Sequence, residues 1–277
     1  MVWNSVKGRL QIINILVGKI PQIMYTILVR TGGIFMYTWD SRVRFSEIGE
    51  DKRLTLDGIL NYFQDSSTFH SEDIGNGMEV VESLHRVWVL SSWQIVVEEY
   101  PKIGERIKLG TWPYDFNRFF GGRNFIMYGE DGRVLAYANS LWTYLNSENG
   151  RPARVDDRIL ELYKLEPKYD MKYADRKIAL PEDMEAQNSF PVEVYHLDTN
   201  HHVNNGQYVK MAGAYLPQGF EIAQMRAEYK KSALLGNVIC PKVYQDETKV
   251  IVSLDDEAGN AYTVVEFLVR SELGTER

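Results

Sequence analysis

Three segments of this chain occur twice, in the same order and at a nearly constant spacing. The matched pairs are residues 46–63 with 195–212, residues 93–107 with 225–239, and residues 130–137 with 257–264. The second pair places Gly104 on Gly236, and the first pair places Thr55 on Asn204. Such an ordered set of matches predicts two copies of one unit, each built from a strand, a helix and several long antiparallel strands.

The helix of the first copy has the clearer pattern. Four apolar residues at i, i+3, i+4 and i+7 form one stripe, and Thr55 before them is a good N-cap. The stripe consists of Leu56, Ile59, Leu60 and Phe63. In the second copy Asn204 or Asn205 takes the cap, and the expected stripe and stop consist of Tyr208, Val209, Ala212, Tyr215, Leu216, Pro217 and Gly219.

Most of the remaining chain alternates apolar and polar residues between turn signals, as strands do. We therefore predict an α+β protein made of two similar units, each a long antiparallel sheet wrapped around one central helix. The predicted divisions are an extension over residues 1–35, a first unit over 36–148, a polar linker over 149–188 and a second unit over 189–277.

Composition excludes several classes of function. Hydrophobic residues make up 44% of the chain, as in ordinary globular proteins, and the net charge of −7 gives no general attraction for nucleic acid. The single cysteine, Cys240, fits a reducing compartment, so we expect a cytoplasmic protein. The first 35 residues hold four basic and no acidic side chains. Lys19 and Pro21 keep their apolar runs well short of the ~20 residues of a membrane span. We therefore expect either a poorly ordered extension or an overlong start before Met36.

The densest group of polar side chains lies in LDTNHHVNNGQYV, residues 197–209. On an extended strand Asp198, Asn200 and His202 share one face, but Asp198 and His202 would be roughly 13 Å apart. The loop must therefore curl for the two to cooperate. Directly after it comes the predicted helix N-terminus, whose N–H groups favour a developing negative charge. The residues assigned to this oxyanion site are Asn204, Asn205 and Gly206, the glycine allowing close approach of a ligand.

A carboxylate, an imidazole and an amide beside a helix N-terminus suit hydrolysis of an activated acyl group. The same set suits proton abstraction next to a thioester carbonyl, as in a dehydratase. Residue types alone do not separate these reactions. The chain contains no G-x-G-x-x-G before a helix, no Walker loop, no C-x-x-C and no G-x-S-x-G.

The run from Asp198 to Asn205, D-x-N-x-H-V-N-N, resembles the signature of the acyl-acyl-carrier-protein thioesterases of plants and bacteria. The segments YFQDSSTFHSED, WVLSSWQ, GTWPYDF and YANSLW resemble the bacterial branch. This resemblance implies a tandem hot-dog fold and hydrolysis of fatty acyl-acyl carrier protein to free fatty acid. It assigns catalysis to Asp198, Asn200 and His202, places the acyl chain largely in the first unit around helix 56–69, and implies no cofactor or metal.

Two positions depart from that pattern. The family often has an acidic residue where this chain has Ser232, which we assign to orienting water, and plant members follow it with a cysteine where this chain has Ala233. At the positions of the first copy that match Asp198, Asn200 and His202 the chain has Gly49, Asp51 and Arg53, so the first unit is expected to bind rather than catalyse.

Several interpretations stay open at this point. A 3-hydroxyacyl thioester dehydratase, an acyl-CoA thioesterase and a non-catalytic acyl-thioester binding module are the alternatives. Acyl carrier protein is the expected partner. Its docking surface would be formed by Arg118, Arg123, Lys230 and Lys231. The alternative is that these four residues are ordinary solvated surface charges. His70 and His85 are expected at helix ends or on the surface. Chain length and a homodimer are undecided by the residues.

Overall fold

The structure is a computed structural model that describes residues 29–31 and 34–270. Its strands are β1 (Val29–Thr31), β2 (Ile34–Arg42), β3 (Arg86–Val97), β4 (Arg106–Asn117), β5 (Phe120–Gly129), β6 (Val134–Asn146), β7 (Glu185–Ala186), β8 (Phe190–Pro191), β9 (Ile222–Tyr229), β10 (Val238–Gln245), β11 (Lys249–Asp255) and β12 (Ala261–Val269). Its helices are α1 (Leu56–Asp73), α2 (Met78–Ser83), α3 (Asp157–Leu162) and α4 (Asn205–Gly213), with single 3₁₀ turns η1 (Phe45–Glu47) and η2 (Val194–His196).

The predicted extension falls mostly on residues 1–28, which lie outside the described residues. Strand β2 begins at Ile34, two residues before the predicted start of the first unit at Met36, and β1 pairs with it. In the described part of the chain, no helix combines the length and the apolar composition that crossing a lipid bilayer requires.

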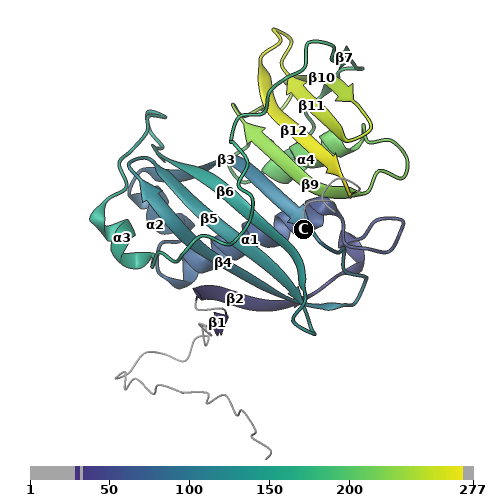
Figure 1. Cartoon of the computed structure of the whole chain (residues 1–277). Coiled ribbons are helices and arrows are strands. Elements are labelled where there is room, and N and C mark those ends of the chain that lie inside the picture. Colours follow the sequence, from purple (N-terminus) through teal and green to yellow (C-terminus); the bar gives the residue numbers. More distant parts are fainter. Residues whose placement is uncertain (1–28, 32–33, 271–277) are drawn as a thin grey trace, which may run out of the picture.

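The strands form one continuous antiparallel sheet with the order β1-β2-β4-β5-β6-β3-β9-β12-β11-β10-β7, and β8 pairs with β10. The first half of this sheet curves around α1 and the second half packs against α4 (Figure 1). The halves join where β3 and β9 pair, with Ser92 opposite Glu228 and Val96 opposite Gln224. The chain is thus an α+β tandem hot dog, as the sequence predicts.

The repeat is visible in the turns between strands. The aligned glycines Gly104 and Gly236 have φ angles of +79° and +77°, and Gly132 and Gly259 have +83° and +81°. Each of these angles lies in the left-handed region that glycine occupies at no steric cost. The two units therefore change direction at equivalent points, which explains why these glycines align in the sequence.

Helix α1 forms as its apolar spacing predicts. The hydroxyl of Thr55 accepts a hydrogen bond from the Gly58 N–H at 3.2 Å, and the four stripe residues Leu56, Ile59, Leu60 and Phe63 are all buried. Helix α4 is shorter than predicted, because it ends at Gly213 rather than continuing through Leu216. The N–H groups of Tyr215 and Leu216 bond to carbonyls three residues back, so the chain tightens into 3₁₀-type turns before Pro217.

The linker forms a strap (residues 164–180) that crosses the sheet on the face opposite α1 (Figure 1). Buried side chains of the sheet hold its backbone. The side chain of Gln94 donates to the Lys172 carbonyl at 2.9 Å and accepts from the Ala174 N–H at 2.9 Å. Asn124 accepts from the Tyr169 N–H at 3.1 Å. These contacts fix the strap because buried side-chain amides need partners.

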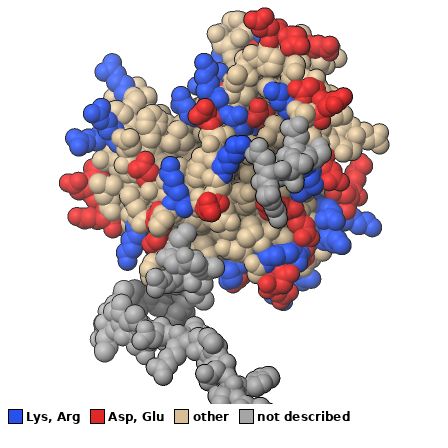
Figure 2. Space-filling view, viewed as in Figure 1, with Lys and Arg blue, Asp and Glu red and all other residues tan. Residues whose placement is uncertain are grey.

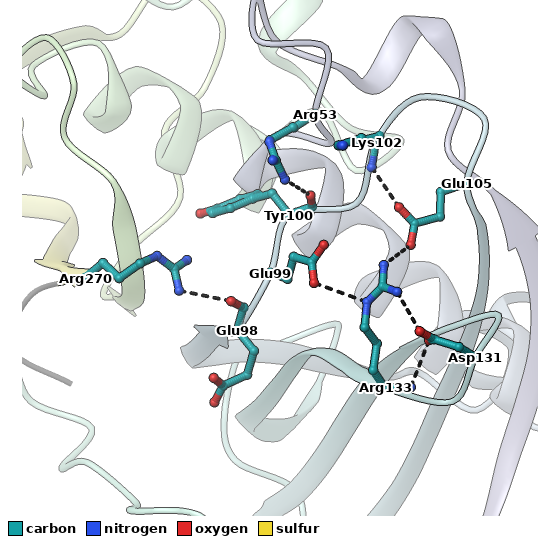
Figure 3. Close-up of polar contacts among 9 residues, drawn as sticks. All are labelled: Arg53, Glu98, Glu99, Tyr100, Lys102, Glu105, Asp131, Arg133 and Arg270. Atoms are coloured by element: carbon teal, nitrogen blue, oxygen red, sulfur yellow. Dashed lines mark hydrogen bonds and ion pairs between the residues drawn. The ribbon is translucent and has the colours of Figure 1, made fainter. Parts of the chain in front are cut away.

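Polar contacts of Arg270, directly after β12, and of Tyr100, after β3, also tie the two units together. Arg270 donates to the carbonyls of Glu98 at 3.0 Å and Val97 at 3.3 Å, and the Tyr100 hydroxyl donates to the Ile222 carbonyl at 3.3 Å. Figure 3 shows Arg270 pointing at Glu98 beside the loop that follows β3. The two halves of the sheet are therefore held together by side chains as well as by the β3–β9 ladder.

Candidate active site

The segment between η2 and α4 closes into a tight loop that brings Asp198 and His202 together. Leu197 and Val203 form an antiparallel bridge, and the Asp198 N–H donates to the His202 carbonyl at 2.7 Å. His201 makes the reversal with a φ of +60°. The polar run therefore curls, and the roughly 13 Å separation of an extended strand does not arise.

Asp198 holds this loop with one oxygen of its carboxylate. Oδ1 accepts from the backbone N–H of Asn200 at 2.8 Å and from that of His202 at 3.2 Å. The other oxygen, Oδ2, has no hydrogen-bond partner within residues 34–270. One oxygen of the carboxylate thus stabilises the loop, while the other makes no hydrogen bond in the described part of the chain.

A cavity of about 960 Å³ is lined by this loop on one side and by elements of the first unit on the other. The second unit contributes Asp198, Thr199, Asn200, His202, Val203, Asn204, Asn205 and Ser232 to its wall. The first unit contributes parts of α1, α2, β3, β4, β5 and β6, and among its apolar side chains are Trp88, Leu90, Phe116 and Trp142. The candidate catalytic groups and an apolar chamber therefore share one space.

Helix α4 begins directly after the loop. Asn204 is its N-cap and accepts from the Gly206 N–H at 2.8 Å, while the Gln207 N–H bonds to the Asn204 carbonyl at 2.9 Å. The Asn205 N–H is left as the first-turn amide without an acceptor in the described part of the chain. Asn204 and Asn205 line the cavity, whereas Gly206 is buried against α1, where a Cβ would lie 2.9 Å from Asn61 Oδ1. The close approach at Gly206 is therefore between helices and not to a ligand.

Ser232 follows β9 and lines the same cavity. Backbone contacts of its neighbours place it beside the loop, because the Val203 N–H donates to the Ala233 carbonyl at 3.0 Å and His202 bridges Leu234. Glu228, the nearest acid before it on the strand, points to the opposite face and accepts from the Ile178 N–H of the strap at 3.1 Å. Glu228 therefore cannot take the place of an acid beside Asp198.

The first unit keeps the backbone of the loop without its chemistry. The Gly49 N–H donates to the Arg53 carbonyl at 2.9 Å, and Lys52 has a φ of +63°, as at Asp198 and His201. Arg53 stands where His202 stands in the second unit, and it donates to the Tyr100 carbonyl at 2.8 Å (Figure 3). In the first unit the Arg53 side chain therefore stabilises the loop that follows β3.

The four basic residues assigned to a carrier patch do not gather on one surface. Arg118 lies in the turn between β4 and β5, and strands β5, β6 and β3 separate it from Lys230 and Lys231, which follow β9. Lys231 pairs with Asp256, and Lys230 lies 3.8 Å from Glu228. Blue and red side chains are interspersed over the face shown in Figure 2.

Arg123 contradicts its predicted surface position, because only 7% of the residue is exposed. Its Nη1 lies 3.0 Å from His70 Nδ1 and 3.2 Å from Thr111 Oγ1, and its guanidinium carbon lies 5.5 Å from the ring centroid of Tyr163. His70 stands in the last turn of α1, as expected for a helix end, but it faces inward. Arg123 and Tyr163 both line the cavity, so this group belongs to its wall.

Sequence reasoning missed Gln64. It stands on α1, it lines the cavity, and its Oε1 is buried without a hydrogen-bond partner. Its position four residues after Leu60 continues the apolar stripe of the helix, and a polar residue on such a stripe is the signal that could have singled it out.

The arrangement as a whole can activate water and stabilise an oxyanion. Asp198 Oδ2 and the His202 ring are both groups of a type that can act as a base, and the N-terminus of α4 has an amide N–H and the positive end of a helix dipole. Among the described residues no group of three or more His, Cys, Asp or Glu side chains is placed to hold a metal ion.

Fold and site together define a double hot-dog protein in which the loop of the second unit opens on an apolar cavity of the first. The chain belongs to the acyl-ACP thioesterase family. The family's N-terminal domain model, "Acyl-ACP thioesterase N-terminal domain", matches residues 33–163, and "Acyl-ACP thioesterase C-terminal domain" matches residues 180–268.

Plant enzymes are among its relatives in sequence. It is 23% identical over 270 residues to the chloroplastic palmitoyl-acyl carrier protein thioesterase of Gossypium hirsutum, which covers 90% of this chain and 63% of that protein. It is 24% identical over 218 residues to oleoyl-acyl carrier protein thioesterase 1 of Arabidopsis thaliana, which covers 71% of this chain and 60% of that protein. The chain therefore spans about three fifths of the length of these curated relatives.

Solved structures share the fold. An acyl-ACP thioesterase of Bacteroides thetaiotaomicron superposes with a TM-score of 0.78 at 21% identity, covering 84% of this chain and 97% of that one. The 12:0-ACP thioesterase of Umbellularia californica superposes with a TM-score of 0.73 at 19% identity, covering 85% and 97%. At these identities the likeness speaks for the tandem fold alone.

Proposed function

We propose that this protein hydrolyses the thioester of fatty acyl-acyl carrier protein to a free fatty acid and the carrier thiol. Membership of the acyl-ACP thioesterase family supports the reaction class. The observation that carries the proposal is the shared cavity, in which Asp198, Asn200 and His202 line one part and apolar side chains of the first unit line another. A thioester carbonyl at the loop then leaves its alkyl chain in apolar surroundings.

The chemistry requires a base, an oxyanion site and a proton for the leaving group. A water oxygen attacks the thioester carbonyl carbon while Asp198 Oδ2 or the His202 ring takes its proton. The negative charge that develops on the carbonyl oxygen is stabilised by the Asn205 N–H at the N-terminus of α4. The carbon–sulfur bond then breaks, and the thiolate takes up the proton that the base received. Water supplies the hydroxyl group of the acid and the proton of the thiol, so the reaction needs no cofactor.

Asn200 and Ser232 complete the proposed site as orienting groups. Both are exposed and line the cavity beside Asp198, so each can contact the attacking water or the thioester. Acyl carrier protein is the proposed partner. Because Arg123 is buried and Arg118 lies apart from Lys230 and Lys231, we propose that the docking surface for the carrier includes either Arg118 or the two lysines.

The test is release of free fatty acid from matched acyl-ACP and acyl-CoA substrates of several chain lengths. The wild type is compared with Asp198→Ala and with Asp51→Ala as the matched control. Asp51 accepts from the Arg53 N–H at 3.0 Å in the corresponding loop, but it does not line the cavity. The control therefore removes a comparable loop contact away from the proposed chemistry.

Hydrolysis of acyl-ACP that collapses in Asp198→Ala and persists in Asp51→Ala supports the proposal. Turnover confined to coenzyme A thioesters transfers the activity to the acyl-CoA class. Conversion of 3-hydroxyacyl thioesters without release of acid indicates a dehydratase, and acyl binding without turnover of any substrate indicates a binding module.

A further inference from the structure

Arg123 has one edge of its guanidinium that no other group of the protein occupies. Its Nη1 donates to two acceptors, His70 Nδ1 at 3.0 Å and Thr111 Oγ1 at 3.2 Å, which fix the orientation of the planar group. Nε and Nη2 make no hydrogen bond or ion pair within residues 34–270. We call these two atoms the free edge, and one N–H of each points in the same direction because the guanidinium is planar.

The free edge reaches open space and is not sealed in the core. The buried side-chain atoms without a hydrogen-bond partner in the described part of the chain belong to Gln64, Trp93, Tyr144 and Thr263, and none belongs to Arg123. Since Nε and Nη2 also lack a partner, both must have accessible surface. Arg123 lines the cavity, so the cavity is the space that the free edge faces.

No acid in the described ranges offsets the charge of this buried cation. Glu72 lines the same cavity, but its carboxylate accepts from the Met78 N–H at 2.9 Å. Asp73 accepts from the Tyr37 hydroxyl at 2.8 Å. Neither acid forms an ion pair with Arg123, whose two acceptors are an imidazole and a hydroxyl. A buried charge without a counter-ion is costly, so a ligand anion would find a partner here.

The strand pairings place Arg123 well inside the first unit. Arg123 on β5 pairs with Ser140 on β6. Ser140 pairs with Trp93 on β3, which pairs with Ala227 on β9 of the second unit. Three strand spacings of ~4.8 Å put Arg123 about 14 Å from β9 along the sheet. The guanidinium nevertheless lines the same cavity as Asp198.

We propose that the free edge of Arg123 binds a carboxylate at the end of an aliphatic chain inside this cavity. The parallel N–H groups of Nε and Nη2 match the two oxygens of a carboxylate, which is the bidentate geometry that guanidinium groups favour. The chain itself would lie among the apolar side chains of the cavity wall, which include Trp88, Leu90, Phe116 and Trp142.

Two sources would supply such a carboxylate. The first is an acyl thioester whose chain ends in a carboxylate, with the thioester at the Asp198 loop and the carboxylate at Arg123, and this source rests on the proposed function. The second is a free fatty acid that enters the cavity carboxylate first and competes with acyl chains for the space. Both make the same contact, so the experiment has one arm for each.

The first arm measures equilibrium binding without turnover. Isothermal titration compares the saturated alkanoates from octanoate to hexadecanoate with the 1-alkanols of equal length. We expect the wild type to bind at least one alkanoate about tenfold or more tighter than its alkanol, and Arg123→Met to lose that preference. Arg123→Lys keeps the charge without the fork and should recover only part of it. Arg86→Met, the loss of another arginine from the same cavity wall, should stay within about threefold of the wild type.

The second arm measures kcat/KM for an acyl-ACP whose chain ends in a carboxylate and for the unsubstituted acyl-ACP of equal length. The ratio of the two values cancels any effect on carrier docking. We expect this ratio to fall about tenfold or more in Arg123→Met and to change less than about threefold in Arg86→Met. Thermal unfolding of each variant checks that it is folded.

The outcomes separate the two sources and the possible failures. A fall in the kcat/KM ratio assigns the carboxylate to the substrate, and a fall in alkanoate preference alone assigns it to a free fatty acid. If neither depends on Arg123, or if Arg86→Met has an equal effect, the inference is wrong while the proposed function stands. If the wild type hydrolyses no acyl-ACP, the proposed function fails and alkanoate binding still decides this site. If Arg123→Met does not fold, the same measurements on Arg123→Lys decide, because a wild-type alkanoate preference in that variant would rule out the bidentate contact.

Discussion

Arg123 Nη1 lies 3.0 Å from His70 Nδ1, so a buried cation donates to a neutral imidazole in the wall of the cavity. The guanidinium has only donors, and Nδ1 must therefore accept. Burial, reinforced by the positive charge of Arg123, lowers the pKa of His70 to about 3. Burial also lowers the pKa of Arg123, to about 10, which leaves it charged at neutral pH.

This pair predicts a pH-dependent stability. His70 titrates near its ordinary value of 6.5 in the unfolded chain and near 3 in the folded protein. The unfolded state therefore binds a proton more readily, and the stability present above pH 6.5 is lost as the pH falls toward 3. Between pH 7 and pH 5 the protonation of His70 alone lowers the free energy of unfolding by about 2 kcal/mol. Urea unfolding at the two values should show that loss in the wild type and not in His70→Asn.

The control for that measurement is His201→Asn. His201 is exposed and asparagine tolerates its positive φ angle, so this variant should keep the wild-type pH dependence. Equal slopes for the wild type and His70→Asn would show that His70 is not neutral in the folded protein.

Asp198→Asn separates the two halves of the carboxylate. The amide oxygen can still accept from Asn200 and His202, whereas the charge and the basic Oδ2 are lost. We expect Tm within about 2 °C of the wild type and kcat lower by about 100-fold or more. Asp198→Ala should lose a further 1–2 kcal/mol of stability, roughly the worth of the two loop hydrogen bonds. Thermal unfolding and acyl-ACP hydrolysis measure both. A fast Asp198→Asn would leave His202 as the base.

Ser232→Glu should raise kcat, because an acidic side chain at this exposed position adds acceptor oxygens beside the proposed attacking water. We expect a rise of about tenfold, with Tm within about 2 °C of the wild type. Steady-state hydrolysis of an acyl-ACP substrate and thermal unfolding measure the two quantities. Leu235→Glu, a new charge at a position that is 54% exposed on the same segment, is the control and should leave kcat within about twofold of the wild type. An unchanged kcat in Ser232→Glu would show that a missing acid does not limit the rate.

The strap predicts a large stability loss for Asn124→Ala. The side chain is fully buried, accepts from the Tyr169 N–H at 3.1 Å and the Tyr173 hydroxyl at 3.0 Å, and donates to the Ala138 carbonyl at 3.1 Å. Its removal leaves these groups unpaired, which should lower the free energy of unfolding by about 2–4 kcal/mol. Urea unfolding measures the loss, and limited proteolysis should show faster cutting in the strap. The exposed Asn149→Ala should cost less than about 1 kcal/mol.

Much of the fold was predictable because the repeat and the apolar stripes are local patterns. The loop at Asp198 was also predictable, because a polar run must curl before a helix cap if its side chains are to meet. Arg123 was placed wrongly because charged side chains are rarely buried. Arg123 stands two and four residues before Phe125 and Met127, so the three share one face of the strand, and both apolar residues are fully buried. That spacing of two was the available signal. That Gln64 lines the cavity depends on how the elements of the two units pack around it, and no local pattern contains that packing.

The retained loop of the first unit has a consequence for how such a protein can change. In a symmetric dimer of identical chains, every substitution in the loop alters both active sites at once. Here the loop at Gly49 keeps its backbone, and Arg53 has become a support for Tyr100. Under the proposed function, a fused pair can therefore refine substrate fit in one half while the other preserves the reaction, and a single substitution at Asp198 would silence the whole chain.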